Sequence, residues 1–225
     1  CNLLCKNQQF SSTQPITQLP QITTNYSYKS IRMIFKFLWI IISFLAGSLP
    51  LAVWIGRLAG KDIRQYGDGN PGATNVLRAA GWPWYILALI ADISKAAMPV
   101  GLAYQIFGWQ DWWIVPIALA PPLGHAFSPF LDWQGGKALA TLLGTWIGLT
   151  YWIVPSAGII SLIIFVGLLK GDAWAVLISM AVLHLLIFFI LPNPIFMTII
   201  FLQTLLVIWT HWHGLQHRPQ LRFLA

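Results

Sequence analysis

Apolar residues gather in long runs along this chain, and few polar residues interrupt them. A helix needs about 20 apolar residues to cross a hydrocarbon core about 30 Å thick, and such runs recur as far as the C-terminal region. We predict seven spans, at residues 34–55, 82–107, 112–130, 138–154, 156–169, 173–191 and 194–212. The middle runs are short or close together, so six or eight spans also fit. The pattern predicts an all-α polytopic membrane protein.

Composition supports a membrane protein. Of the 225 residues 57% are hydrophobic and 8% are charged, against a usual charged fraction of about 25%. The 13 tryptophans and six tyrosines suit the aromatic belts that lie at membrane interfaces. In a membrane protein a net charge of +7 reflects the positive residues that orient the spans and that contact anionic membrane lipids. We expect no nucleic-acid partner.

The first 32 residues differ from the rest, because they are rich in Gln, Ser and Thr and contain no apolar run. We predict that residues 1–32 are a disordered extension or an upstream-translated leader, followed by a membrane domain at residues 33–225. Met33 opens the first apolar run and is a plausible true start. Cys1 suggests lipidation but no lipobox precedes it, and with Cys5 it says little about the redox state of the core.

Positive charges favour one orientation of the spans. Alternate connections and the C-terminal tail carry eight Lys or Arg residues, and the remaining connections carry none. The eight are Arg57, Lys61, Arg64, Arg78, Lys137, Lys170, Arg218 and Arg222. By the positive-inside rule these connections are cytoplasmic and the N-terminus is outside, although four positive residues before and at the start of span one argue weakly the other way.

A polar, glycine-rich segment at residues 61–78 follows the first span. It combines glycines, asparagines and arginines, and Gly residues let backbone N–H groups approach an anion closely while Arg binds phosphate oxygens in pairs. The candidate phosphate-binding residues are Arg64, Gly67, Gly69, Asn70, Gly72, Ala73, Thr74 and Asn75, with Asp68 and Arg78 beside them. The position of this segment predicts that a phosphate is handled at a membrane surface.

A second polar segment follows the third span. Gly135-Gly136-Lys137 would place free N–H groups and a lysine at a helix start, which is another anion site. His125 lies shortly before them and is either a helix-end histidine bonded to backbone or a functional residue. The tail adds His211, His213 and His217. One site built from several cytoplasmic loops accounts for all these motifs.

At these residues the chain resembles the bacterial acyl-phosphate:glycerol-3-phosphate acyltransferases, over residues 34–224. The matching motifs are Gly47-Ser48-Leu49-Pro50, Asp62-Ile63-Arg64, the segment from Gly67 to Arg78, Gly124-His125, Gly135-Gly136-Lys137, Ala140-Thr141 and His217-Arg218. The resemblance implies transfer of an acyl chain from acyl phosphate to glycerol 3-phosphate, giving lysophosphatidic acid and phosphate in the first step of phospholipid biosynthesis. It implies no cofactor and no metal, a bacterial inner membrane with the site facing the cytoplasm, and an upstream enzyme that supplies acyl phosphate.

The resemblance also implies roles for individual residues. The catalytic candidates are Asp68, Arg78, His125, Lys137 and His217, and Gln220 joins Gly135, Gly136 and the glycine-rich segment in phosphate binding. Arg78 and Lys137 would neutralise charge on the departing phosphate. Phosphate is a good leaving group, so no covalent intermediate is required. The hydroxyl proton passes either to a histidine or to the acyl phosphate itself.

Several positions depart from the family pattern. Asp68 replaces a usual serine, Ala138 replaces a glycine, Gly171-Asp172 stand where a serine-containing segment is usual, and Gln220 and Phe223 replace an asparagine and an arginine. A carboxylate at position 68 repels phosphate unless Arg64 or Arg78 pairs with it or it serves as a base. These changes raise an alternative, a catalytically altered paralogue with another acceptor or a lipid-binding role.

Polar residues inside the predicted spans raise a further alternative. Asp92 and Lys95 are three residues apart, which lets them pair on one helix face, and intramembrane charges are usually functional. They are either a structural ion pair or functional groups. With His184 they would suit a transporter, although a lone histidine in an apolar helix is more often satisfied within the core.

Overall fold

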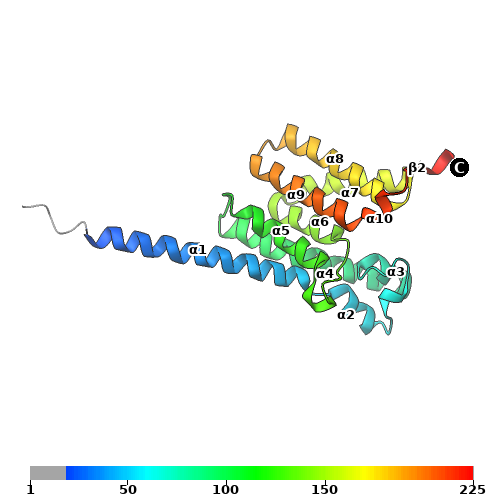
Figure 1. Ribbon diagram of the computed structural model, residues 1–225, viewed down its shortest axis with the longest axis horizontal. Coiled ribbons are helices and arrows are strands. Elements are labelled where there is room, and N and C mark those ends of the chain that lie inside the picture. Colours follow the sequence, from blue (N-terminus) through cyan, green and yellow to red (C-terminus); the bar gives the residue numbers. More distant parts are fainter. Residues whose placement is uncertain (1–18, 225) are drawn as a thin grey trace, which may run out of the picture. The chain divides into compact units, whose positions relative to one another are not determined.

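The computed structural model describes residues 19–224 and consists mainly of apolar helices (Figure 1). The chain divides into two compact units, residues 1–37 and residues 38–225. The α-helices are α1 (Leu19–Ser48), α2 (Leu51–Leu58), α3 (Ala73–Ala80), α4 (Trp82–Gly101), α5 (Ile114–Ala126), α6 (Leu139–Thr150), α7 (Ile153–Leu168), α8 (Asp172–Ile190), α9 (Pro194–Thr210) and α10 (Trp212–Leu215).

Short elements complete the chain. A π-helical turn, η3 (Leu102–Ile106), extends α4, and short 3₁₀ turns lie at η2 (Ile63–Gln65), η4 (Pro129–Leu131) and η5 (Arg222–Leu224). Strands β1 (Leu169–Lys170) and β2 (Gln220–Leu221) pair antiparallel, with Leu169 opposite Leu221. This pairing attaches the C-terminal tail to the connection between α7 and α8.

Each predicted apolar run contains a helix, and the first run contains two. Pro50 separates α1 from α2 because proline has no N–H to donate and fixes its own φ. Within residues 19–224, four helical stretches are long and apolar enough to cross a membrane, and α6, α7 and α9 are shorter apolar helices. The four stretches are Lys29–Leu58, Trp82–Ile106, Ile114–Leu131 and Asp172–Ile190.

Helix α1 overlaps the predicted N-terminal extension. It begins at Leu19 and runs through residues 19–32, although they contain no apolar run. The rest of the predicted extension, with Cys1 and Cys5, lies outside the described residues.

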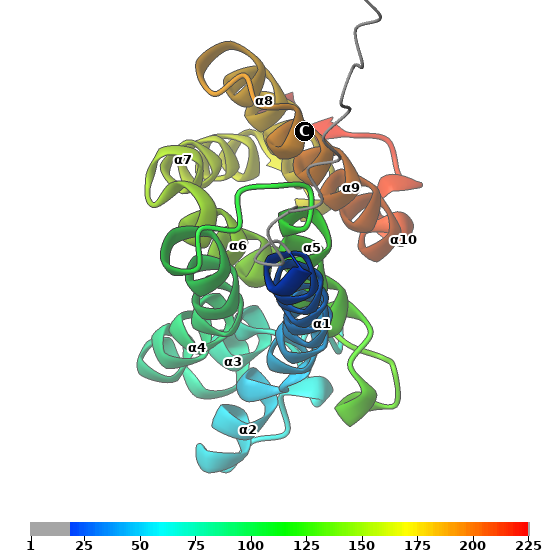
Figure 2. The ribbon, with the colours of Figure 1, turned by 90° about the vertical axis from the view of Figure 1, so that its left-hand side faces the viewer.

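Small residues bring α4 and α6, which lie side by side (Figure 2), into close contact. A Cβ atom at Gly144 would meet the carbonyl oxygen of Ile93, and one at Gly148 would lie 2.7 Å from the backbone nitrogen of Gly101. Small residues at such spacing let apolar helices approach closely. This packing fixes α6, which follows directly after Lys137 and Ala138, closely against α4.

Ala138 begins α6 in a strained conformation. Its φ is +64°, in the left-handed region, and it is 1% exposed. A left-handed conformation costs a non-glycine residue about 1–2 kcal/mol, so the alanine that replaces the family's usual glycine is not a neutral change. Its buried methyl group partly offsets that cost, because burying a methyl stabilises by about 0.8 kcal/mol.

We expect Ala138→Val to lower the free energy of unfolding by about 2 kcal/mol, because a β-branched side chain fits poorly at positive φ in a closed space. Ala138→Gly is the matched control and should change it by less than about 1 kcal/mol, since relief of strain and loss of the methyl group oppose each other. Thermal unfolding in detergent measures both. Equal melting temperatures for the valine variant and the native protein would contradict this account of the helix start.

Candidate active site

The glycine-rich segment is held by its own polar side chains. Asp68 Oδ1 accepts hydrogen bonds from the Asn70 backbone N–H at 3.3 Å and from Asn75 Nδ2 at 3.0 Å. Asn75 Oδ1 in turn accepts from Arg78 Nη1 at 2.7 Å. These bonds fix the segment against α3, whose first N–H groups, at Ala73 and Thr74, have no acceptor within the helix.

Gly67 makes this arrangement possible. Its φ is +61°, and a Cβ atom there would meet Arg78 Nη1 and lie 2.5 Å from Asn75 Oδ1. The missing side chain therefore leaves room for the guanidinium to lie across the loop. Gly69, at φ +74°, also needs the conformational freedom of glycine.

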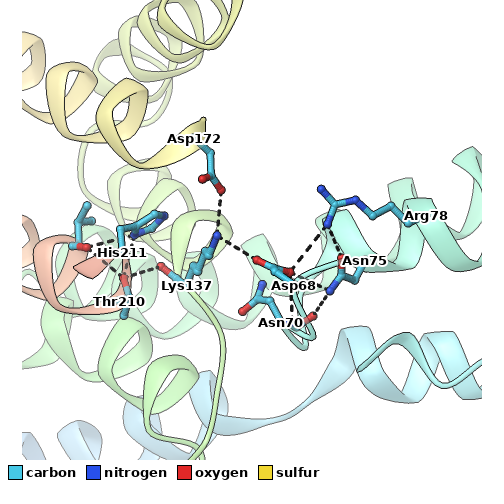
Figure 3. A network of polar contacts seen from close by, with 9 residues as sticks. Asp68, Asn70, Asn75, Arg78, Lys137, Asp172, Thr210 and His211 are labelled. Atoms are coloured by element: carbon cyan, nitrogen blue, oxygen red, sulfur yellow. Dashed lines mark hydrogen bonds and ion pairs between the residues drawn. The ribbon is translucent and has the colours of Figure 1, made fainter. Parts of the chain in front are cut away.

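Lys137 joins three segments that are far apart in the sequence (Figure 3). Its Nζ lies 3.0 Å from Asp68 Oδ2 and 2.9 Å from Asp172 Oδ2, at the start of α8. Arg78 Nη1 lies farther from Asp68, at 3.8 Å. We expected Arg64 or Arg78 to neutralise Asp68. Arg64 pairs with Asp62 instead, at 3.3 Å, so Lys137 is the main partner and Arg78 the secondary one.

These contacts set the charge states of the loop residues. Partial burial favours the neutral form of Asp68, but the hydrogen bond and charge of Lys137 outweigh it and hold the pKa below its ordinary value. Partial burial also disfavours the Lys137 cation, yet Asp172 and Asp68 raise its pKa. Because the pKa of Asp68 is lowered, its contribution to stability is present above the ordinary carboxyl pKa and is lost as pH falls through the lowered one.

Gly135 and Gly136 have a different role from the one predicted. Helix α6 begins at Leu139, and the two glycine N–H groups donate to the carbonyl oxygens of Ala126 and His125, both at 3.0 Å. They are therefore not free to bind phosphate. A Cβ atom at Gly135 would meet the His125 carbonyl oxygen, so this glycine pair packs the second motif against the end of α5.

A cavity of about 300 Å³ opens beside these residues, with a polar end and an apolar wall. The polar end includes Asp68, Asn70, Thr74, Arg78, Lys137 and Asp172, and His125 and Asp92 also line the cavity. The apolar wall comes from α6, α7 and α8 and includes Leu142, Trp146, Val154, Ile159 and Met180. The twelve residues of α6 rise about 18 Å, close to the roughly 15 Å of a single hydrocarbon leaflet.

A second hollow of about 530 Å³ adjoins the first. It is lined by Arg64, Gly69, Gly135 and Gly136, and it shares Asp68, Asn70 and Lys137 with the cavity. Two adjoining spaces around one lysine can hold two phosphorylated groups. Thr210 at the end of α9 also lines the hollow, and its hydroxyl donates to the Lys137 carbonyl oxygen at 3.4 Å.

The predicted tail residues lie elsewhere. Neither cavity is lined by His217 or Gln220. The His217 carbonyl oxygen accepts a hydrogen bond from Trp174 Nε1 at 2.7 Å, and Gln220 pairs with Lys170 in the two strands. Sequence reasoning did not identify Thr210 or assign a role to Asp172. The position of Asp172 directly after Lys170-Gly171, a connection predicted to be cytoplasmic, was the available signal.

The polar residues inside the helices behave in two ways. His184 is satisfied within α8, where Nδ1 lies 2.8 Å from the Met180 carbonyl oxygen, as expected. Asp92 and Lys95 form the expected pair at 2.9 Å, with both side chains buried. Asp92 lines the cavity, so this pair belongs to the candidate site and is not isolated in the bundle.

The sequence model of the family described as glycerol-3-phosphate acyltransferase matches residues 37–218, which include every residue of this site. The chain belongs to that family. A glycerol-3-phosphate acyltransferase of Thermus thermophilus is 35% identical over 185 residues, which cover 79% of this chain and 88% of the relative. Glycerol-3-phosphate acyltransferase 1 of Thermotoga maritima is 41% identical over 126 residues, 53% of this chain and 60% of the relative.

Solved structures show the same fold. PlsY (YgiH), an integral membrane glycerol 3-phosphate acyltransferase, superposes with a TM-score of 0.73 at 27% identity, covering 80% of this chain and 90% of PlsY. It has been crystallised in a glycerol 3-phosphate form and in a lysophosphatidic acid form. The likeness confirms the resemblance seen in the motifs and the helical membrane-protein fold.

Proposed function

We propose that this protein transfers an acyl chain from acyl phosphate to the 1-hydroxyl of glycerol 3-phosphate, producing lysophosphatidic acid and inorganic phosphate. The observation that carries the proposal is the cavity, which joins a polar end containing Arg78 and Lys137 to an apolar wall from α6, α7 and α8. A substrate with a phosphate head and a hydrocarbon tail matches that division. The adjoining hollow would hold the second phosphorylated substrate.

The residues at the polar end have complementary roles. Arg78, Thr74 and the first N–H groups of α3 would bind one phosphate, and Lys137 would neutralise charge on the departing one. The hydroxyl oxygen forms the ester bond to the acyl carbonyl carbon. The bond from that carbon to the phosphate oxygen breaks, its electron pair leaves with the phosphate, and the departing phosphate takes up the hydroxyl proton.

The motif loops place the reaction at one membrane face. Lys and Arg residues concentrate in the connections that contain the motif loops, so we assign that face to the cytoplasm. The bacterial inner membrane is the corresponding location. A soluble glycerol 3-phosphate would then reach the polar end from the cytoplasm, while the acyl chain remains within the bilayer.

One observation favours the alternative of an altered acceptor. Asp68 and Asp172 both contact Lys137, so two carboxylates share the cation that the departing phosphate needs. A neutral or less highly charged acceptor than glycerol 3-phosphate would be repelled less. The acceptor is therefore the part of the proposal that needs direct measurement.

The test is acyl transfer by the purified protein in lipid nanodiscs. With acyl phosphate and labelled glycerol 3-phosphate we expect labelled lysophosphatidic acid and one equivalent of phosphate. Glycerol and acyl-coenzyme A, offered in place of the acceptor and the donor, are the matched controls. Product with glycerol but none with glycerol 3-phosphate would support the altered acceptor, and no product from any combination would overturn the proposed reaction.

A further inference from the structure

A buried polar cluster lies between the cavity and the start of α2. Lys95 Nζ lies 2.9 Å from Asp92 Oδ1, 2.8 Å from the Leu49 carbonyl oxygen and 2.8 Å from His125 Nδ1. Lys95 is 6% exposed, Asp92 1% and His125 8%. The cluster connects α4, α5 and the break after α1, and the roles proposed above do not use Lys95.

The three contacts determine what each group donates. An ammonium group has three N–H donors and no lone pair, and Lys95 has three neighbouring oxygen or nitrogen atoms. Asp92 at 2.9 Å favours the ammonium form by direct charge attraction. His125 Nδ1 must then accept a proton from Lys95, so the neutral imidazole carries its own hydrogen on Nε2.

The other ring nitrogen faces the site. A Cβ atom at Gly136 would meet His125 Nε2 and would lie 3.3 Å from Asn70 Oδ1, so Nε2 occupies the space that this glycine leaves open, beside Asn70. His125 and Asn70 line the cavity together. The Nε2–H group is therefore placed where a phosphate or carbonyl oxygen of the acyl donor would lie.

We propose that Lys95, held by Asp92, is a positioning residue that fixes His125 as a neutral hydrogen-bond donor to an oxygen of the acyl phosphate. This inference rests on the proposed function for its substrate. It assigns His125 a role different from proton acceptor, because Nδ1 is occupied by Lys95 and Nε2 already bears hydrogen. A fixed donor of this kind stabilises developing negative charge without reorganisation during the reaction.

The charges around His125 support this assignment. Lys95 and Asp92 face it from α4, and Arg78, Lys137 and Asp68 line the same cavity from the two motif segments. An ammonium in direct contact opposes a second positive charge on the ring. We therefore expect the ring to stay neutral between about pH 6 and pH 9.

Nitrogen NMR of the protein labelled at histidine tests the tautomer without any substrate. His125→Gln identifies the His125 signals by their loss. We expect a protonated Nε2 and an unprotonated Nδ1 whose shifts stay constant across that pH range. A protonated Nδ1, or a ring that titrates, would overturn the proposal whether or not the protein transfers acyl groups.

The matched variant removes both members of the ion pair, because removing one alone would leave an unpaired buried charge. In Asp92→Asn/Lys95→Met, Nδ1 loses its donor and we expect mixed tautomers, with kcat about tenfold lower and KM little changed. If the double variant does not fold, Lys95→Arg keeps the cation and should keep the Nε2–H tautomer. A double variant with the native tautomer and native kcat would show that Lys95 does not position His125.

Substitution of His125 distinguishes a role as hydrogen-bond donor from a role as proton acceptor. Gln places an amide N–H near the position of Nε2 but cannot accept a proton there, whereas Ala provides neither. We expect His125→Gln to lose less than about tenfold in kcat and His125→Ala about 10²-fold or more. Equal losses in the two variants would contradict a donor role.

Discussion

Replacing Lys137 with methionine is expected to lower kcat/KM for acyl transfer by about 10²–10³-fold. Lys137 lines both cavities and is the closest cation to Asp68 and Asp172. Methionine keeps the apolar stem but removes the charge that would neutralise the departing phosphate. The two carboxylates would then face the phosphate without their shared partner, so the loss should appear in kcat as well as in KM.

Lys170→Met is the matched control. Lys170 is exposed in β1, carries the same charge on the same side of the protein, and lines neither cavity. We expect its kcat/KM to stay within about twofold of the native value and the thermal stability of both variants to change little, since exposed ion pairs contribute about 0–1 kcal/mol. If the Lys137→Met protein is folded and keeps the native kcat, Lys137 has no role in the reaction.

The helices could be predicted from the sequence because each is an apolar run, and apolar length is what a membrane selects. Helix ends were less predictable. A proline in an apolar run can either kink a helix or end it, so the break at Pro50 could not be predicted from the sequence. The start of α1 at Leu19 could not be predicted either, because no apolar run begins there. Segment existence follows from hydrophobicity, whereas boundaries depend on local backbone geometry.

The sequence predicted which kinds of residue form the site, but not which of them contact one another. Asp68, His125, Lys137 and Asp172 meet only because α6 packs closely on α4 through glycines such as Gly144. No spacing in the sequence encodes that approach. The sequence indicated phosphate chemistry and offered Arg64 or Arg78 as a partner for Asp68. The folded chain provides Lys137 at 3.0 Å and Arg78 at 3.8 Å.

Backbone donors were the least predictable part of the site. A glycine pair before a helix suggests free N–H groups, but those of Gly135 and Gly136 donate to carbonyl groups of α5. Hydrogen bonds of this kind depend on the tertiary approach of another segment. The same dependence places Gln220 in the strand pair and His217 shortly before it, and neither residue lines a cavity, although His217-Arg218 resembles the family's terminal motif.

Asp68 helps to hold the glycine-rich segment in shape, but its negative charge opposes the binding of a phosphate. It holds Asn75 and Lys137 in place, yet it brings a carboxylate to the end of the cavity where we propose that phosphate binds. With Asp172 it sets two negative charges against the single charge of Lys137, and Arg78 at 3.8 Å from Asp68 is the nearby compensation. The balance between these effects decides whether the aspartate lowers or supports activity.

We expect Asp68→Ser to lower KM for glycerol 3-phosphate about fivefold, with kcat changed by less than about threefold. Serine can still accept from Asn75 and from the Asn70 N–H, as a hydroxyl commonly does in such turns, so the loop should keep its shape. Removing the charge frees Lys137 for phosphate, and a half-exposed repulsion of this kind is worth about 1 kcal/mol. Steady-state kinetics at two salt concentrations measures the change in KM, and added salt should reduce the difference in KM between the variant and the native protein.

The double variant Asp68→Ser/Asp172→Ser extends the argument to both carboxylates. Full additivity would amount to about 2 kcal/mol and a KM roughly 30-fold lower than that of the native protein, but both carboxylates contact Lys137, so we expect a smaller fall. Asp111→Ser, at a carboxylate that lines neither cavity, is the matched control for loss of one negative charge. A rise in KM for Asp68→Ser would show that the aspartate is needed chiefly to organise the loop, and that its ion pair with Lys137 forms part of the working site.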